Sequence, residues 1–167
     1  MNAQASRVLI LDTQRIERKI LRMAWQIWEH NSNRQSLTLI GIAGSGEAIA
    51  DKLAGHLRDI SSLAVTVLKL ELSKKDPVQS PVTVSDEIRD DSVVLVDDVA
   101  NSGRTLLYAL KPVMDAGPKQ ILISVLVNRK HKSFPVSPDI IGHQVATTLQ
   151  ENIVVSQENG KMVAYLE

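Results

Sequence analysis

The chain contains the segment Val93-Val94-Leu95-Val96-Asp97-Asp98-Val99-Ala100-Asn101-Ser102-Gly103-Arg104-Thr105, in which apolar residues precede two adjacent carboxylates and a small polar turn. A charge that is buried without a partner costs several kcal/mol, so two acids at the end of an apolar strand require a reason. In an open α/β sheet, the carboxyl ends of the strands form the ligand crevice. We therefore expect a buried parallel strand that ends with Asp97 and Asp98 facing a ligand.

The residue types in this segment favour a phosphorylated sugar as the ligand. Ionised carboxylates accept hydrogen bonds, which suits the two hydroxyls of a ribose. The turn that follows leads into a helix N-terminus, where backbone N–H groups, the helix dipole and the hydroxyls of Ser102 and Thr105 can hold a phosphate. A Walker loop is excluded because its Gly-x-x-x-x-Gly-Lys-Ser/Thr pattern does not occur. For each residue taken singly, an ordinary role as a turn or cap residue stays open.

The composition is typical of one soluble domain spanning residues 1–167, since 44% of the 167 residues are hydrophobic. Nineteen basic and nineteen acidic residues give a net charge of zero, so no global field attracts nucleic acid or membrane. The absence of cysteine excludes disulfides, thiol nucleophiles and thiolate zinc sites, and it suits a cytoplasmic location. No apolar run approaches the ~20 residues that a membrane-spanning helix needs.

Strand-like and helix-like periods alternate along the chain, which predicts an α/β fold with an open, twisted, mainly parallel sheet and helices on both faces. A helix is expected after Asp12 or Thr13, with its end near Asn31 to Asn33. Further strands are expected at Leu37 to Ala43, Leu63 to Leu72, Ser92 to Val96 and Ile121 to Val127, and a helix at Thr105 to Ala116.

Two regions lack a sustained period. Ser73 to Asp91 is polar and contains two prolines, so we expect a long mobile loop that acts as a lid or binding loop, with disorder without function as the alternative. Beyond the last long strand, short β-like pieces at Ile140-Ile141, Ile153 to Val155 and Met162 to Leu166 predict a small accessory layer.

A second glycine-containing turn, Ala43-Gly44-Ser45-Gly46, connects a predicted strand to a helix. Glycines there let backbone amides approach an anion closely. A dinucleotide fingerprint is the weaker interpretation, because no third Gly or Ala stands at the required place. A plain tight turn remains open.

The segment around Asp97 and Asp98 resembles the signature of the type I phosphoribosyltransferases. The resemblance covers nearly the whole chain and is most specific to the bifunctional pyrimidine-operon attenuator and uracil phosphoribosyltransferase family, through Arg7-Val8-Leu9-Ile10-Leu11-Asp12, Val125-Leu126-Val127-Asn128-Arg129-Lys130-His131-Lys132-Ser133-Phe134-Pro135 and Asp139-Ile140-Ile141-Gly142. It implies the type I fold with a small C-terminal hood. It also implies an enzyme that uses 5-phosphoribosyl-1-pyrophosphate (PRPP) and Mg²⁺ to convert a free base, uracil, into its nucleoside monophosphate, with release of pyrophosphate.

The resemblance assigns roles to particular residues. Asp97 and Asp98 would hold the ribose hydroxyls as the catalytic acids, and Mg²⁺ would arrive bound to PRPP, so no residue is assigned as a direct metal ligand. The remaining assignments are the 5-phosphate turn (Val99, Ala100, Asn101, Ser102, Gly103, Arg104, Thr105), the pyrophosphate loop (Ala43, Gly44, Ser45, Gly46), the flexible loop (Lys74, Lys75) and the base site (Val127, Asn128, Arg129).

This sequence departs from the family's pattern at three places. The pyrophosphate loop has no basic side chain where the family usually has Thr-Arg-Gly, and Leu72-Ser73-Lys74-Lys75-Asp76 stands where the family has an aromatic residue, an arginine and acids. Asn128 replaces the usual Asp, and Lys130 replaces a Gly. A nucleotide sensor with weak or no catalysis and a purine phosphoribosyltransferase therefore remain alternatives.

The resembling family also binds messenger RNA and usually forms homodimers or homotetramers. Arg15, Arg18, Lys19 and Arg22 form a basic stripe at helical spacing that is a candidate RNA-binding site. The alternative is an amphipathic helix whose exposed face is basic, as zero net charge and 3% aromatic residues suggest.

Overall fold

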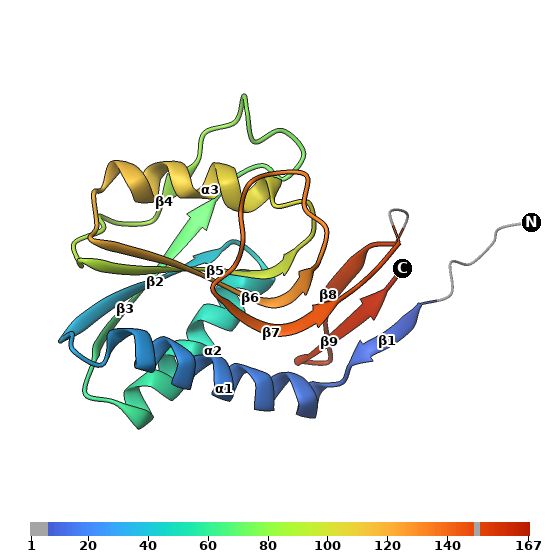
Figure 1. The fold of residues 1–167 in the computed structure, drawn as a ribbon, viewed down its shortest axis with the longest axis horizontal. Helices are drawn as coiled ribbons and strands as arrows, with labels where there is room; N and C mark the ends of the chain where they lie inside the picture. Colours follow the sequence, from blue (N-terminus) through green and yellow to red (C-terminus); the bar gives the residue numbers. More distant parts are fainter. Residues whose placement is uncertain (1–6, 149–150) are drawn as a thin grey trace, which may run out of the picture.

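A computed structural model describes residues 7–148 and 151–167. These residues form two sheets, one of six strands in the order β4-β3-β2-β5-β6-β7 and one of three strands in the order β1-β9-β8 (Figure 1). The helices of this part of the chain are α1 (Thr13–Asn31), α2 (Ser45–Ile60) and α3 (Arg104–Asp115). The strands are β1 (Val8–Leu11), β2 (Ser36–Ile42), β3 (Ala64–Glu71), β4 (Thr83–Val84), β5 (Ser92–Ala100), β6 (Gln120–Arg129), β7 (Ile140–Val145), β8 (Ile153–Glu158) and β9 (Lys161–Leu166).

The six-stranded sheet is parallel from β3 to β7, and only its short edge strand β4 runs antiparallel. Its central strands β2, β5 and β6 are almost wholly buried, as their continuous apolar runs require. In Figure 1, α1 and α2 cover one face of this sheet and α3 covers the other, and each face has its own apolar cluster. The prediction of an α/β fold with helices on both faces is confirmed.

The first helix, α1, begins where the sequence predicted a helix start. Asp12 is its N-cap, since the Asp12 carboxylate accepts a hydrogen bond of 2.8 Å from the backbone N–H of Arg15. The helix buries an apolar face that includes Ile16, Ile20, Met23, Ala24 and Ile27. No helix in the described part of the chain is long and apolar enough to cross a membrane.

The expected accessory layer is only partly correct. Ile140 and Ile141 belong to β7, which is the parallel edge strand of the main sheet. Two hydrogen bonds of 2.8 Å bring it there, because Asp139 donates its backbone N–H to the carbonyl of Ile123 and accepts from the Ile123 N–H with its carboxylate. Gly142 then allows close packing, since a Cβ at this position would lie 2.5 Å from the carbonyl oxygen of Leu126. The accessory layer is instead formed by β8 and β9, and the N-terminal strand β1 pairs antiparallel with β9.

The segment from Ser73 to Asp91 is more structured than the sequence predicted. It contains β4, which pairs with β3, and it packs Val82, Val84 and Ile88 against the apolar cluster on the α3 face. At its end, the Asp90 carboxylate accepts hydrogen bonds of 2.6 and 2.7 Å from Ser36 and Thr38 of β2. The loop therefore leaves the sheet at the carboxyl end of β3 and is anchored again at Asp90, before β5 begins.

Candidate functional site

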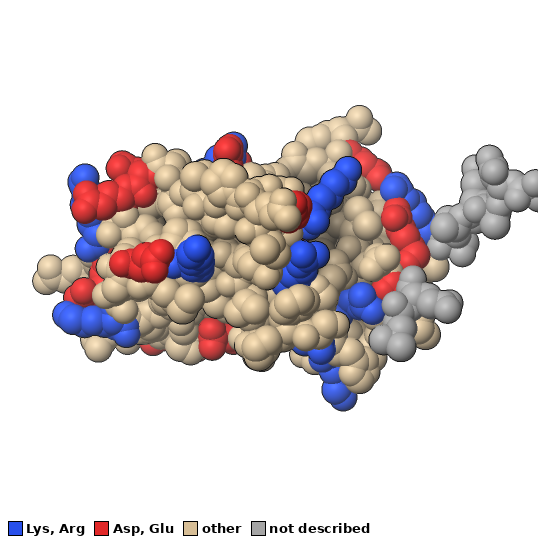
Figure 2. Space-filling view, turned by 90° about the horizontal axis from the view of Figure 1, so that it is seen from above, with Lys and Arg blue, Asp and Glu red and all other residues tan. Residues whose placement is uncertain are grey.

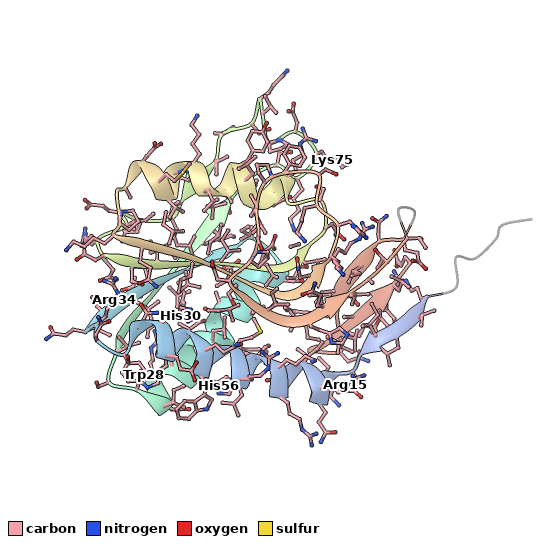
Figure 3. All side chains as sticks on the ribbon, viewed as in Figure 1. Arg15, Trp28, His30, Arg34, His56 and Lys75 are labelled. Atoms are coloured by element: carbon pink, nitrogen blue, oxygen red, sulfur yellow. The ribbon has the colours of Figure 1, made fainter. Side chains whose placement is uncertain are left out.

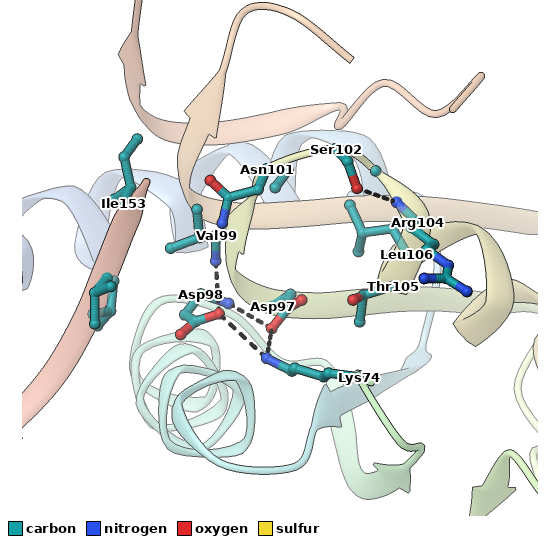
Figure 4. A pocket seen from close by; sticks show the side chains of 14 residues that line it. Lys74, Asp97, Asp98, Val99, Asn101, Ser102, Arg104, Thr105, Leu106 and Ile153 are labelled. Atoms are coloured by element: carbon teal, nitrogen blue, oxygen red, sulfur yellow. Dashed lines mark hydrogen bonds and ion pairs between the residues drawn. The ribbon is translucent and has the colours of Figure 1, made fainter. Parts of the chain in front are cut away.

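The two acids lie at the carboxyl end of β5, at the middle of the main sheet (Figure 4). Asp97 is 1% exposed, and its Oδ1 accepts a hydrogen bond of 2.9 Å from the backbone N–H of Asp98. The side chain of Asp98 is 15% exposed, and its Oδ1 accepts one of 2.8 Å from the N–H of Val99. Both carboxylates are therefore held by the backbone that follows them.

Lys74, from the long loop, lies over this acid pair. Its Nζ is 3.9 Å from Oδ1 of Asp97 and 3.9 Å from Oδ1 of Asp98 (Figure 4). The Lys74 side chain is 52% exposed, so its ammonium is partly screened by water. Lys75, assigned with it, is exposed and lies outside the cavity described below.

Burial raises the pKa of Asp97 well above its ordinary value, and the neighbouring Asp98 charge raises it further, while the charge of Lys74 acts in the opposite direction. A carboxyl whose pKa is higher in the folded than in the unfolded state loses stabilisation as the pH rises through the folded-state pKa. The ionised Asp97 is therefore a cost to folding at neutral pH.

The Asp97→Asn variant is accordingly expected to be more stable than the wild type at neutral pH. The amide keeps an oxygen to accept the Asp98 N–H and carries no charge, so Tm is expected to rise by about 3–6 °C. This difference should shrink as the pH falls below the ordinary Asp pKa of about 3.9, because the carboxyl then becomes protonated in the unfolded as well as the folded state. Thermal unfolding across that pH range measures the difference in Tm. A variant that is less stable than the wild type at neutral pH would contradict the conclusion that the ionised Asp97 destabilises the fold.

The turn after β5 leads directly into the N-terminus of α3. Gly103 adopts φ 86°, in the left-handed region, and α3 begins at the next residue. The carbonyl of Ser102 accepts hydrogen bonds of 3.0 and 3.1 Å from the N–H groups of Ser133 and Phe134, which fixes the turn from outside. Oδ1 of Asn101 is buried and has no hydrogen-bond partner within the described residues, which leaves it available to a ligand.

A cavity of about 210 Å³ connects these features. It is lined by the acid pair, by the whole predicted phosphate turn, by Lys74 and Leu106, and by three residues of β8 that sequence reasoning did not assign to the site: Ile153, Val154 and Val155. These residues form an apolar wall opposite the polar turn. Their signal in the sequence was only a short apolar run, which does not indicate what the strand faces.

The predicted pyrophosphate loop lies against the acid pair, outside the lining of the cavity. Gly44 adopts φ 96°, and α2 begins at Ser45. Gly46 packs on the end of β5, since a Cβ there would lie 2.9 Å from the carbonyl oxygen of Val96 and 3.2 Å from Oδ1 of Asp97. The glycine is thus required for the close approach of helix and strand.

The residues predicted to contact the base lie at the end of β6, outside the cavity lining. Val127 and Asn128 are buried. Nζ of Lys132 donates to Oδ1 of Asn128 and to the carbonyl of Arg129, and burial together with the Arg129 charge lowers the pKa of Lys132. The Arg129 guanidinium donates to Oγ1 of Thr147 at 2.7 Å and to the carbonyl of Thr148 at 2.9 Å, so it holds the chain between β7 and β8.

Most of the predicted RNA-binding residues on α1 make internal contacts. Arg15, near the start of α1 in Figure 3, donates to the carbonyl of Ile10 at 3.2 Å, Lys19 to that of Gly142 at 3.3 Å, and Arg22 to that of Gly142 at 2.6 Å. Burial, followed by the charges of Arg22 and Arg15, lowers the pKa of Lys19. On the α3 side, Figure 2 shows basic and acidic groups interspersed. Arg18 is exposed and makes no side-chain hydrogen bond within the described residues.

The donor set fits Mg²⁺ that reaches the site with its substrate. Among the described residues, no cluster of three or more His, Cys, Asp or Glu side chains is placed to hold a metal ion. Mg²⁺ usually takes one or two protein carboxylates together with phosphate oxygens and water. Asp97 and Asp98 supply that number of hard oxygen donors at the cavity.

The sequence is similar to proteins of known family along most of its length. A family model described as "Phosphoribosyl transferase domain" matches residues 8–155. The chain is 36% identical over 156 residues to a protein named Bifunctional protein PyrR from Pelotomaculum thermopropionicum, covering 87% of this chain and 86% of that one. It is 33% identical over 158 residues to the Bifunctional protein PyrR of Ligilactobacillus salivarius, covering 87% and 89% respectively.

Solved structures show the same fold at lower sequence identity. The hypoxanthine phosphoribosyltransferase of Trypanosoma cruzi superposes with a TM-score of 0.77 at 18% identity, over 93% of this chain and 94% of that one. A hypoxanthine-guanine phosphoribosyltransferase of Bacillus anthracis gives 0.75 at 17% identity, over 93% and 96%. The chain belongs to the type I phosphoribosyltransferases and, within them, to the family of PyrR proteins.

Proposed function

We propose that this phosphoribosyltransferase transfers the phosphoribosyl group of PRPP, supplied with Mg²⁺, to uracil, and so forms the nucleoside monophosphate and releases pyrophosphate. One observation carries the proposal: the acid pair and the turn at the start of α3 line the same cavity at the carboxyl end of β5. The cavity therefore offers acceptors for a sugar diol beside donors for its phosphate.

The 5-phosphate would occupy the turn from Val99 to Thr105. The first backbone N–H groups of α3 have no partner within the helix and carry the positive end of the helix dipole, so they are available to a phosphate at this position. The hydroxyls of Ser102 and Thr105 add donors beside the same cavity. With the phosphate held there, the ribose hydroxyls reach the carboxylates of Asp97 and Asp98.

Lys74 would change partners when PRPP enters. In the structure its ammonium lies 3.9 Å from both carboxylates, where it offsets their mutual repulsion. A diol that donates two hydrogen bonds replaces this interaction, and the lysine becomes available to the pyrophosphate oxygens. The basic side chain that the pyrophosphate loop lacks is thereby supplied from the long loop.

The reaction would need positioning and charge stabilisation more than a nucleophilic side chain. As the bond from the anomeric carbon to pyrophosphate breaks, positive charge develops on the sugar, and the carboxylates of Asp97 and Asp98 beside it stabilise that charge. Bound Mg²⁺ would neutralise negative charge on the departing pyrophosphate. The free base would pack against the apolar wall of Ile153 and Val155, and the end of β6, with Asn128, would contribute to base selection.

A turnover assay with PRPP, Mg²⁺ and a panel of free bases tests the proposal. Uracil is expected to be converted with a kcat/KM at least about 100-fold above those of hypoxanthine and guanine, because a site built for one hydrogen-bonding edge rejects another strongly. A preference for a purine would overturn the base assignment and leave the transfer reaction. Binding of PRPP without product from any base would refute the enzyme and favour a nucleotide sensor.

An RNA-binding attenuator is the second candidate function. The observation in its favour is the exposed Arg18 beside the basic residues at the start of α1. Binding to a pyrimidine leader transcript that weakens steeply with salt would support it, since phosphate contacts release counterions.

A further inference from the structure

A second cavity lies beside α3, where the long loop between β3 and β4 passes this helix (Figure 1). Its volume is about 220 Å³, close to the 210 Å³ of the cavity at the acid pair. The loop forms one wall, between Pro77 and Val82, and α3 forms the other. Among the described residues, the two cavities share no lining residue, and the proposed reaction makes no use of the second one.

The α3 wall is one face of the helix. Its residues Tyr108, Lys111, Pro112 and Asp115 are spaced at three and four positions, so they lie in one row along α3. Lys111 and Asp115 are exposed, and within the described residues neither side chain takes part in an ion pair. One charge of each sign therefore remains available beside the cavity.

Pro112 leaves a backbone acceptor without its helical donor in the same wall. It lies inside α3, and proline has no N–H to donate to the carbonyl four residues earlier, which is that of Tyr108. Helix carbonyls point toward the C-terminus and side chains lean toward the N-terminus, so this carbonyl and the Asp115 carboxylate approach each other near Pro112. The wall thus presents two acceptors at one place.

The loop wall is apolar. Pro77 is buried at its base, and the side chain of Val78 is 61% exposed at the rim. Pro81 and Val82 continue this wall. An apolar group that enters the cavity would remove part of this surface from water, which favours binding.

We propose that this cavity binds an α-amino acid with an apolar side chain. The ammonium of the ligand would donate to the Tyr108 carbonyl and to the Asp115 carboxylate, and its own carboxylate would accept from the Lys111 ammonium. Its side chain would pack on the loop wall. Because the lining carries one charge of each sign, a zwitterion complements it, whereas a simple anion or a simple cation would meet a like charge.

The bound amino acid should weaken PRPP binding, a consequence that rests on the proposed function. The ligand would bridge the loop and α3, and so hold the loop in its present position. Lys74 precedes Pro77 by three residues and lies 3.9 Å from both carboxylates of the acid pair. PRPP requires this lysine to move away, so the two ligands should bind with negative coupling.

Isothermal titration of L-leucine and of L-phenylalanine into the full chain tests the site without PRPP. One site per chain is expected. N-acetyl-L-leucine and L-leucinamide each lack one of the two charges and should bind at least about tenfold more weakly than L-leucine. Asp115→Asn should weaken L-leucine binding by a similar factor, whereas Asp59→Asn, the same change at an exposed position outside the cavity, should leave it unchanged.

Pro112→Ala provides a test that misfolding cannot imitate. Alanine restores the N–H that bonds the Tyr108 carbonyl within the helix, so the variant should have a higher Tm and yet bind L-leucine at least about tenfold more weakly. No heat with either amino acid, or unchanged L-leucine affinity in both Asp115→Asn and Pro112→Ala, would overturn the amino-acid site.

A titration of PRPP in the presence of saturating L-leucine tests the coupling separately. The affinity for PRPP is expected to fall by about fivefold or more. An unchanged affinity would overturn the coupling. A chain that binds L-leucine but gives no heat with PRPP would refute the proposed function while it supports the amino-acid site.

Discussion

The double variant Asp97→Asn, Asp98→Asn is expected to lose nucleotide formation by a factor of about a thousand or more in kcat/KM. Amides keep the size of the acids and the hydrogen bonds from the N–H groups of Asp98 and Val99, but they carry no charge. They therefore cannot stabilise the positive charge that develops on the ribose, and removal of one such preorganised group typically costs 10²- to 10³-fold. A steady-state assay with PRPP and uracil measures the loss.

The matched control for this variant is Asp59→Asn. Asp59 is an exposed carboxylate near the far end of α2, outside the cavity lining, so the same chemical change there should leave kcat/KM within about twofold of the wild type. A double variant with nearly wild-type activity would show that the acids are structural and would remove the basis for the proposed reaction.

Gly46→Val is expected to destabilise the protein by about 2–4 kcal/mol and to abolish PRPP binding in any remaining folded fraction. A Cβ at this position would lie 2.9 Å from the carbonyl oxygen of Val96 and 3.2 Å from Cα of Asp97, and both of these atoms belong to the site strand. Because backbone cannot move aside cheaply, α2 must shift away from β5 and displace Asp97. Chemical denaturation measures the stability, and a titration with PRPP measures the binding.

Gly55→Ala in the same helix is the control for Gly46. A Cβ at Gly55 would meet nothing within 4 Å, and alanine is about 1 kcal/mol better than glycine inside a helix. This variant should be as stable as the wild type or up to about 1 kcal/mol more stable, with unchanged PRPP binding. Equal tolerance at both glycines would contradict the close packing of α2 on the end of β5.

The parts of the fold that depend on local pattern were predictable from the sequence. The apolar run of β5 required burial on both faces, and the cap at Asp12 and the apolar spacing of α1 marked that helix. The segment from Val99 to Thr105 was also predictable as one unit, because its small residues and the helix that begins in it have a local chemical meaning. The structure brings that whole turn and the acid pair to one cavity.

Features set by contacts between distant segments were not predictable. The pairing of β7 with β6 depends on hydrogen bonds from Asp139 to Ile123, and nothing in the short run at Ile140 distinguishes an edge strand from an accessory strand. The position of β8 beside the cavity likewise depends on its pairing with β9. Lys74 and Lys75 look equivalent in the sequence, yet only Lys74 reaches the acid pair, because the loop direction is set by its packing on β3 and α3.

Isothermal titration of PRPP with Mg²⁺ into the wild type and into the Asp97→Asn, Asp98→Asn variant tests the central claim most directly, because it needs neither a base nor turnover. The acid pair and the adjoining turn should give the wild type a measurable heat and one site per chain, with affinity at least about 100-fold weaker in the variant. Equal affinity of the two proteins, or no heat with the wild type, would contradict the assignment of this cavity to PRPP.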